Sequence, residues 1–223
     1  AVIEVGIPFS DPIADGPVIQ AAFTAALARG LRLADIFAAV RRVQPALRTP
    51  LVAMVSYSIV FRAGASAFFD SARAAGFDGV IIPDLPSPEA QGVVAKARAT
   101  GLDSIMLVAP TTPPHRRKEI ADLSSGFLYY LSVSGVTGTR AELPSDLTSN
   151  LESLRSITRL PLCVGFGVSR PEHLAGLRGR ADGAIVGSAL VRTISEHIDK
   201  GTSKIVAAVV SACRVLLGER DTD

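Results

Sequence analysis

Two carboxylates near the start of the chain have the setting for proton transfer. Glu4 stands in the apolar run Ala-Val-Ile-Glu-Val-Gly-Ile, where burial would disfavour its charged form and raise its pKa toward neutrality. A carboxyl group with such a pKa can pass a proton in either direction near neutral pH. Side chains alternate along a strand, so Glu4 shares a face with Gly6, which leaves room for a ligand. A buried Glu paired with one of the arginines explains Glu4 alone equally well.

Further carboxylates follow in the loop at residues 8–17. Asp11 precedes a proline and by itself indicates an Asx turn, whereas Asp15 precedes Gly-Pro and by itself indicates a helix N-cap. Glu4 at a strand end and Asp15 in the loop that leaves it form a pair whose surroundings should separate their pKa values. The pair predicts general acid and base catalysis.

Glycines near the end of the chain are placed to bind a phosphate. Gly167 follows one predicted strand, and Gly187 with Ser188 follows the next. In a barrel, the loops after the last two strands commonly bind phosphate through backbone N–H groups at a helix N-terminus. The loop at residues 134–138 would add a third wall and is long enough to act as a lid. The alternative is that the glycines only shape tight turns, which we prefer for Gly165 alone.

The elements that must position these residues alternate between strand and helix. Short runs rich in Val, Ile and Leu predict seven strands, at residues 1–7, 51–57, 79–82, 103–108, 127–132, 161–164 and 183–186. Segments with a period near 3.6 predict helices at residues 17–28, 34–47, 65–75, 88–99, 114–123, 147–157, 171–177, 187–197 and 203–217. Strands that are apolar on both faces and separated by crossover helices predict a parallel sheet that curls into a barrel. Without a linker, residues 1–223 are expected to form a single domain.

Composition narrows the function classes. Hydrophobic residues make up 48% of the 223 residues and charged residues 20%, which excludes long disordered tails, collagen and coiled coil. The formal charge is +2 and the basic residues are scattered, which argues against a nucleic-acid partner. Two cysteines provide no disulfide framework and favour the cytoplasm. No apolar run approaches the roughly 20 residues of a membrane span, and the first residues do not have the pattern of a secretory signal.

Several other residues remain less informative. The three histidines lack a second ligand at metal-binding spacing, so no metal site is predicted. Tyr129 and Tyr130 are adjacent on a predicted strand, so one is expected to face the lumen of the barrel and the other the helices. Cys163 has no His nearby and is not a candidate nucleophile. Asp84 ends a strand at the same rim, where a structural and a functional role are equally good interpretations.

The residues resemble one family, the α subunit of tryptophan synthase. The run Ile-Glu-Val-Gly-Ile-Pro-Phe-Ser-Asp-Pro-Ile-Ala-Asp-Gly at residues 3–16 is similar to the signature of that family position by position. Further matches follow in order, at residues 83–86, 108–113, 132–138, 165–167 and 187–188. The resemblance covers the whole chain and implies a TIM-type (β/α)8 barrel.

The resemblance also implies an activity and site residues. The family cleaves indole-3-glycerol phosphate by a retro-aldol reaction into indole and glyceraldehyde 3-phosphate, without a metal or organic cofactor. By resemblance, Glu4 protonates indole C3 and takes the proton from the glycerol hydroxyl, while Asp15 accepts a hydrogen bond from the indole N–H. The residues expected to line the indole pocket are Phe127, Tyr129, Leu131 and Phe166. Those expected at the phosphate are Gly138, Gly167, Gly187 and Ser188, with Thr137 on the loop that closes over Asp15.

The family implies a partner as well. Its α subunit docks on a β subunit that depends on pyridoxal phosphate (PLP), usually in an α2β2 assembly, and indole passes between the two through a channel. Pro8 and Asp11 match loop positions that meet the β subunit. We therefore expect PLP in the partner and no cofactor in this chain.

The sequence departs from the family pattern at two places. The family normally has a further βα unit ahead of the strand that contains the catalytic Glu, so this chain is expected to be a barrel lacking its first βα unit, with seven parallel strands and two sheet edges. Ser56 and Ser58 stand where the family usually has a Tyr and an Asn.

Two other functions remain open from the sequence. A non-catalytic or weakly active α-type subunit that activates the β subunit would tolerate the departures. A barrel isomerase acting on another sugar phosphate would use the same phosphate site.

Overall fold

The computed structural model describes residues 1–12, 15–131, 144–165 and 167–219, and its paired strands all run parallel. Two four-stranded sheets follow the chain order, β1-β2-β3-β4 and β5-β6-β7-β8. The strands are β1 Ile3–Gly6, β2 Leu51–Met54, β3 Gly79–Ile81, β4 Asp103–Ile105, β5 Leu107–Val108, β6 Leu128–Leu131, β7 Leu162–Gly165 and β8 Gly183–Ile185.

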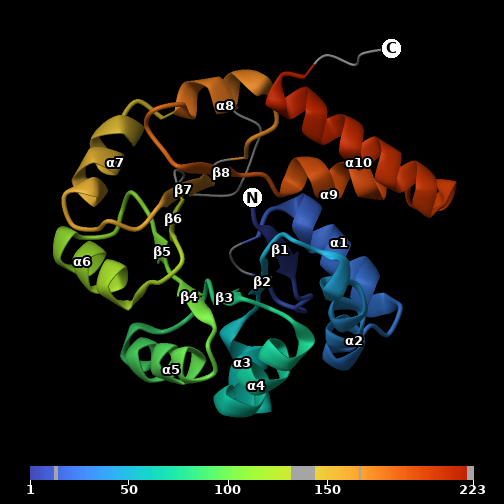
Figure 1. The fold of residues 1–223 in the computed structure, drawn as a ribbon, viewed down its shortest axis with the longest axis horizontal. Helices are drawn as coiled ribbons and strands as arrows, with labels where there is room; N and C mark the ends of the chain where they lie inside the picture. The colour runs from blue at the N-terminus through green and yellow to red at the C-terminus, as the bar shows by residue number, and fades with distance from the viewer. Residues whose placement is uncertain (13–14, 132–143, 166, 220–223) are drawn as a thin grey trace.

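Helices surround the strands in a ring (Figure 1). They are α1 Pro17–Ala28, α2 Leu33–Val43, α3 Tyr57–Ala63, α4 Ala65–Ala75, α5 Ser87–Ala99, α6 Pro114–Leu123, α7 Leu147–Arg155, α8 Pro171–Leu177, α9 Ser188–Ser195 and α10 Thr202–Leu217, with short 3-10 helices at Gln44–Ala46 and Ile198–Lys200. Strands inside and crossover helices outside are the arrangement of a (β/α) barrel, which confirms the predicted fold class.

The seven predicted strands are present, and one of them is divided. Residues 103–108 form β4 and β5, separated at Met106. The Met106 N–H donates to the Ser124 hydroxyl at 3.1 Å instead of a strand neighbour, while its carbonyl accepts the Tyr129 N–H at 3.0 Å. Met106 is therefore the residue at which the ladder passes from one sheet to the other.

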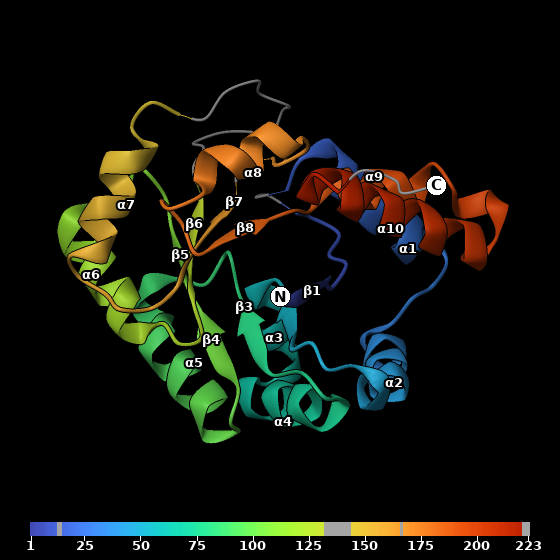
Figure 2. The same cartoon turned by 45° about the horizontal axis from the view of Figure 1, so that its top comes forward.

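The outer strands β1 and β8 differ from the inner ones in burial. Ile3 in β1 is 43% exposed and the residues of β8 are half-buried, whereas the residues of β3 are all buried. Near these strands α1 packs against α9, and α9 against α10 (Figure 2). Neither α1 nor α9 contains a buried residue. Among the described residues no pairing joins β1 to β8, so these strands present the two sheet edges that were expected.

A short helix, α3, was not predicted. Residues 51–57 were expected to be one strand, but β2 ends at Met54 and α3 begins at Tyr57. The Ser56 hydroxyl accepts the Ser58 N–H at 3.3 Å as an N-cap. Asp84 completes the cap, because its carboxylate accepts the Ser56 hydroxyl and the Tyr57 N–H, each at 2.7 Å. The structure therefore gives Asp84 a structural role at the rim.

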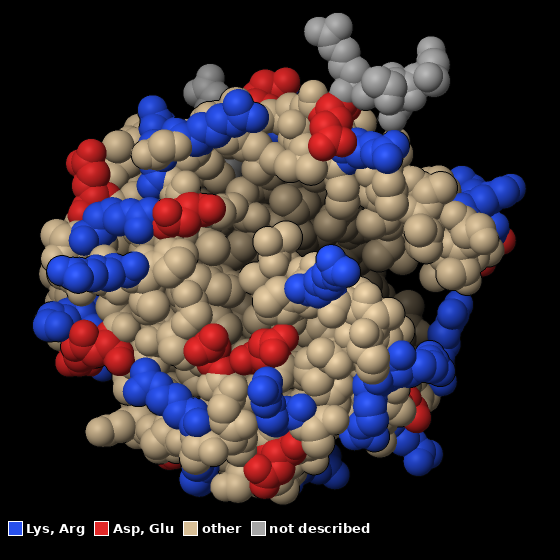
Figure 3. All heavy atoms as spheres, viewed as in Figure 1, with Lys and Arg blue, Asp and Glu red and all other residues tan. Residues whose placement is uncertain are grey.

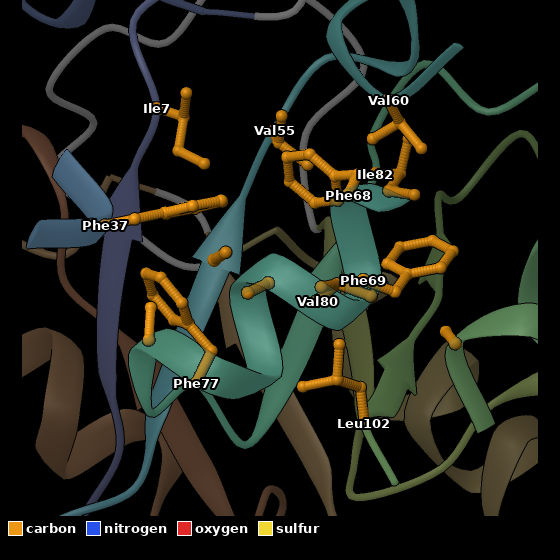
Figure 4. Packing of buried hydrophobic residues seen from close by; sticks show 14 of the residues in the cluster. Ile7, Phe37, Val55, Val60, Phe68, Phe69, Phe77, Val80, Ile82 and Leu102 are labelled. Carbon is orange, nitrogen blue, oxygen red and sulfur yellow. The ribbon is translucent and has the colours of Figure 1, made fainter. Parts of the chain in front are cut away.

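The core is divided by the sheets into an inner and an outer part. Phe37 lies edge-on to Phe68 and Phe77, with ring centroids 5.7 and 6.0 Å apart, in an outer cluster between β1 to β3 and their helices (Figure 4). A second outer cluster covers β5 to β8. The inner cluster lies in the lumen and contains the buried residues Val52, Ile81, Ile105 and Tyr129.

Aspartates that precede two strands fix the strand ends. The Asp182 carboxylate accepts the N–H of Leu162, the first residue of β7, at 2.7 Å and is paired with Arg155. Asp78 does the same for Leu51 in β2 at 3.0 Å. The Leu162 N–H lowers the pKa of Asp182, and Arg155 lowers it further.

We expect Asp182→Ala to reduce the free energy of unfolding by about 1–2 kcal/mol, because the buried Leu162 N–H is left without its acceptor. The lowered pKa means that the contribution is present at neutral pH and is lost as the pH falls through the folded-state pKa. Urea unfolding at pH 7 measures the effect, with the exposed Asp70→Ala as control. Equal stability of the two variants would contradict it.

Candidate active site

Glu4 faces the lumen of the barrel. It is in register with Val52 on β2, and residues in register on parallel strands project to the same side. Val52 belongs to the inner cluster, whereas Ile7 belongs to the outer cluster and Val5 packs against it. Within the described ranges, no Arg or Lys lies within ion-pair distance of Glu4. The described part of the chain therefore gives no support to the alternative in which Glu4 is paired with an arginine.

The surroundings of Glu4 raise its pKa. Loss of hydration within the barrel raises the pKa of Glu4 from 4.5 to about 7, and the negative charge of Asp15 adds to the shift. By its accessible surface Glu4 is nevertheless an exposed residue. A carboxylate that touches water can still lose hydration, because the surrounding barrel wall displaces water beyond the first layer of contacts.

Asp15 does not act as a helix cap. The N-cap of α1 is Gly16, and no side chain caps this end of the helix. At this end of the helix, the backbone carbonyl of Asp15 accepts the Gln20 side-chain N–H at 2.8 Å. The half-buried carboxylate is thus available to a ligand, and burial raises its pKa.

The wall on β6 presents alternate residues to the lumen. Phe127, Tyr129 and Leu131 all belong to the inner cluster, and Tyr130 to the outer one, as the alternation predicted. Tyr129 is 8% exposed, and its pKa is raised first by burial and then by the charges of Glu4 and Asp15. Tyr129, Glu4 and Asp15 therefore share one electrostatic environment. Phe166, the fourth expected pocket residue, lies outside the described residues.

Several lumen residues were not singled out from the sequence. Met54, Leu107 and Ile185 are half-buried and pack against the inner cluster. Each lies on a strand that is apolar on both faces, so the sequence provides no polar alternation that would separate the lumen face from the helix face. The register of the strands distinguishes the two faces, because Leu107 is aligned with Tyr129 and Ile185 with Gly165.

Gly165 has a different role from the turn that we expected. It is the last residue of β7, and a Cβ there would lie 2.7 Å from the Tyr129 hydroxyl oxygen. A glycine is therefore needed because the Tyr129 ring occupies the space of a side chain. The finding corrects the interpretation of Gly165 as a residue that only shapes a tight turn.

We expect Gly165→Ala to displace the Tyr129 ring. For the indole-3-glycerol phosphate implied by the resemblance, kcat/KM should fall by about 10-fold or more, because small displacements in an active site slow the reaction strongly. Steady-state kinetics measure the change. Gly92→Ala in α5 is the control, since a Cβ there meets nothing within 4 Å. It should leave kinetics unchanged and raise stability by about 0.5–1 kcal/mol. Unchanged kinetics for Gly165→Ala would contradict this assignment.

The expected phosphate site is partly described. Gly187 is the N-cap of α9 and Ser188 its first residue, and none of the described side chains caps this end of the helix. Nothing lies within 4 Å of a Cβ placed on Gly187. Gly167 has a φ of +79°, which favours glycine. The first turn of α9 thus presents backbone N–H groups that have no partner within the helix, the kind that bind anions. Gly138 and Thr137 lie outside the described residues.

The rim loop that was expected to meet a partner is at the surface. Asp11 is exposed and accepts the Ser10 hydroxyl at 2.7 Å, and Pro8 is half-buried. On the face shown in Figure 3, acidic and basic side chains alternate around the edge, and mainly other residues line the central hollow.

Three further observations concern metal binding, membrane spans and a cavity. Within the described ranges, no group of three His, Cys, Asp or Glu side chains could hold a metal ion. In the same ranges, no helix is long and apolar enough to cross a membrane. A cavity of about 440 Å³ lies between α8, β8 and α10, and its lining contains none of the candidate site residues.

Comparisons with known proteins agree on one family. The family model described as Tryptophan synthase alpha chain matches residues 1–216. The tryptophan synthase alpha chain of Rhodopirellula baltica is 48% identical over 203 residues, which cover 90% of this chain and 73% of that protein. The relative of the same name from Thermosynechococcus vestitus is 44% identical over 221 residues, which cover 99% of this chain and 81% of that protein. The solved structure of the tryptophan synthase α subunit of Pyrococcus furiosus superposes with a TM-score of 0.87 at 39% identity and covers 97% of this chain and 86% of that one.

Proposed function

Since this chain belongs to the tryptophan synthase alpha chain family, we propose that Glu4 and Asp15 perform the family reaction in the lumen of its barrel. The chain is a lyase of tryptophan biosynthesis that cleaves indole-3-glycerol phosphate to indole and glyceraldehyde 3-phosphate. The observation that supports the two residue roles is the position of Glu4, which faces the lumen, has no cation partner among the described residues and has a pKa raised to about 7 beside Asp15.

In the proposed reaction Glu4 gives up one proton and takes another back. The protonated carboxyl group donates its proton to C3 of the indole ring, and the resulting carboxylate takes the proton of the hydroxyl group on the carbon attached to that ring. The electron pair of this O–H bond forms the aldehyde carbonyl, and the pair of the broken C–C bond restores the aromatic indole. Glu4 ends the cycle protonated, and a pKa near 7 suits both steps.

Asp15 stabilises the charge that develops between these steps. Protonation at C3 places a positive charge on the ring nitrogen, and a carboxylate at that nitrogen stabilises it most when water is excluded. Asp15 is half-buried and lies close enough to Glu4 to raise the pKa of that residue. An Asp15 that remains charged while Glu4 is protonated has the two roles that the reaction requires.

The two halves of the substrate are assigned to different walls. We place the indole ring against Phe127, just before β6, and against Tyr129 and Leu131 on the lumen face of that strand. We place the phosphate at the start of α9, where backbone N–H groups and the Ser188 hydroxyl are available, with Gly167 beside it. The contributions of Gly138, Phe166 and Thr137 rest on the resemblance alone.

Membership of the family implies a β-subunit partner. We propose an α2β2 assembly in which the loop with Pro8 and the exposed Asp11 contacts the β subunit. The cofactor PLP would be bound by the partner, and this chain would need neither a metal nor an organic cofactor for its own step. The two cysteines are free thiols, which supports a cytoplasmic setting.

The test of the function is indole release from indole-3-glycerol phosphate by the chain with and without a β subunit. We expect indole and glyceraldehyde 3-phosphate in equal amounts from the chain alone. If the chain stimulates the β subunit but releases no indole, it is the non-catalytic partner instead. Isomerisation of a sugar phosphate without turnover of indole-3-glycerol phosphate would instead favour the barrel isomerase.

The phosphate assignment is tested separately by Ser188→Ala. We expect the KM for indole-3-glycerol phosphate to rise about 10-fold with little change in kcat, because a hydrogen bond to a charged phosphate contributes about 1.5–3 kcal/mol. The matched control is Ser195→Ala at the other end of α9, whose hydroxyl donates to the Val191 carbonyl at 3.0 Å. A KM that stays at the wild-type value in Ser188→Ala would contradict the assignment.

A further inference from the structure

Arg117 is unusual because it is a buried arginine outside the lumen. It is 9% exposed, and among the described residues it is the one buried Lys or Arg. Its guanidinium group has no ion pair within that part of the chain. Burying a charge is costly unless its hydrogen bonds are satisfied, so the contacts of Arg117 should explain its position.

The contacts of Arg117 join two rim segments. Its Nε–H donates to the Thr112 carbonyl at 2.9 Å, and Nη2 donates to the Pro110 carbonyl at 3.0 Å. Nη2 also donates to Asn150 Oδ1 on α7 at 2.9 Å. Asn150 in turn donates to the carboxylate of Asp146, the N-cap residue of α7, at 3.0 Å. Arg117 therefore ties the loop after β5 to the start of α7, as neighbouring α6 and α7 allow (Figure 1).

The loop that Arg117 holds continues directly from the pocket wall. Its turn is closed by hydrogen bonds in both directions between Ala109 and Thr112, each at 3.0 Å. Leu107, just before this loop, packs against the inner cluster and is in register with Tyr129. A shift of the loop would therefore move Leu107 relative to Tyr129.

Arg117, Asn150 and Asp146 form a polar cluster that also lies behind β6. Tyr130 projects outward from this strand, and its pKa is raised to about 12 by burial and by the charge of Asp146, while Arg117 acts in the opposite sense. Arg117 and Asp146 are thus both close to the back of the strand whose front face presents Phe127, Tyr129 and Leu131. The polar cluster and the proposed indole wall are two sides of one strand pair.

We propose that Arg117 is a positioning residue for the reaction, which holds the loop after β5 against α7 so that Leu107 keeps its spacing from Tyr129 in the wall that binds the indole ring. The inference rests on the proposed placement of indole on β6. It requires a forked donor, since two carbonyls and one side-chain oxygen are contacted at once, and lysine cannot reproduce that geometry.

The experiment compares binding of two probes, indole and inorganic phosphate, by calorimetry. For Arg117→Lys we expect the Kd for indole to rise about 10-fold and the Kd for phosphate to stay within about twofold, since the phosphate site lies at α9. Asn150→Ala removes one of the three contacts and should raise the Kd for indole about threefold, which provides a milder test should the lysine variant fold poorly.

Arg98→Lys is the matched control. Arg98 also donates to a backbone carbonyl at an end of α6, that of Leu123 at 3.0 Å, but at the opposite end of the helix from the rim loop. It should leave the affinity for indole unchanged. Wild-type affinity for indole in Arg117→Lys and Asn150→Ala, an equal loss of both probes, or the same loss in Arg98→Lys would overturn the inference. Failure of the wild-type protein to bind indole would instead count against the proposed function.

Discussion

Replacement of Glu4 by Gln should lower kcat for indole release by about 10³-fold, because the amide can neither protonate indole C3 nor take the hydroxyl proton. Glutamine keeps the size of the side chain, so the affinity for the substrate should change little. Steady-state kinetics on indole-3-glycerol phosphate measure kcat, and binding of indole and inorganic phosphate measures the occupancy of the two halves of the site.

Stability separates loss of chemistry from loss of fold in this variant. The pKa of Glu4 is raised to about 7 in the folded protein, so ionisation of Glu4 reduces the stability of the fold as the pH rises from 4.5 through 7. The Gln variant avoids this loss and should be at least as stable as the wild type at pH 8. A folded Gln variant with wild-type kcat would contradict the role of Glu4, and a variant less stable than the wild type at pH 8 would contradict the raised pKa.

Replacement of Asp15 by Asn should lower kcat by about 10²- to 10³-fold, the range found when one electrostatic contact to a developing charge is removed. The reason is that the amide cannot balance the positive charge on the protonated indole ring. A second effect follows from the pair, because the charge of Asp15 contributes to the raised pKa of Glu4. The acid–base transition assigned to Glu4 in the pH profile should therefore shift to lower pH.

The shift distinguishes an electrostatic role of Asp15 from a structural one. The control is Asp11→Asn on the same loop, which is exposed and should change neither kcat of the isolated chain nor its pH profile. A large loss of kcat in Asp15→Asn with no movement of the pH profile would show that Asp15 acts on the loop and not on the charges in the site.

Helices with strong local signals could be predicted to the residue. The predicted segments 17–28, 114–123 and 171–177 coincide with α1, α6 and α8, each of which begins with a proline at its first position. The segment 65–75 coincides with α4, which ends before Gly76 in the left-handed conformation. Helix α3 was missed because a main acceptor at its start, Asp84, belongs to a different loop of the chain.

The candidate site was predictable where polar residues interrupt apolar strands. Alternation predicted that one of Tyr129 and Tyr130 faces the lumen, and the family resemblance pointed to Tyr129. The role of Gly165 could not be predicted, because it depends on the Tyr129 ring across the strand pair. The network of Arg117 was equally hidden, because its acceptors are backbone carbonyls and a distant Asn. Contacts of this kind appear only when the strands are placed in register.

The carboxyl pKa of Glu4 tests the proton-transfer role most directly. It can be measured by titrating protein with carbon-13 in the glutamate carboxyl groups by NMR, with the Glu4→Gln variant to identify the signal. The proposed environment predicts a pKa of about 7 that falls in Asp15→Asn. A value near the ordinary 4.5, unchanged in Asp15→Asn, would show that Glu4 is hydrated like a surface carboxylate and would contradict the mechanism.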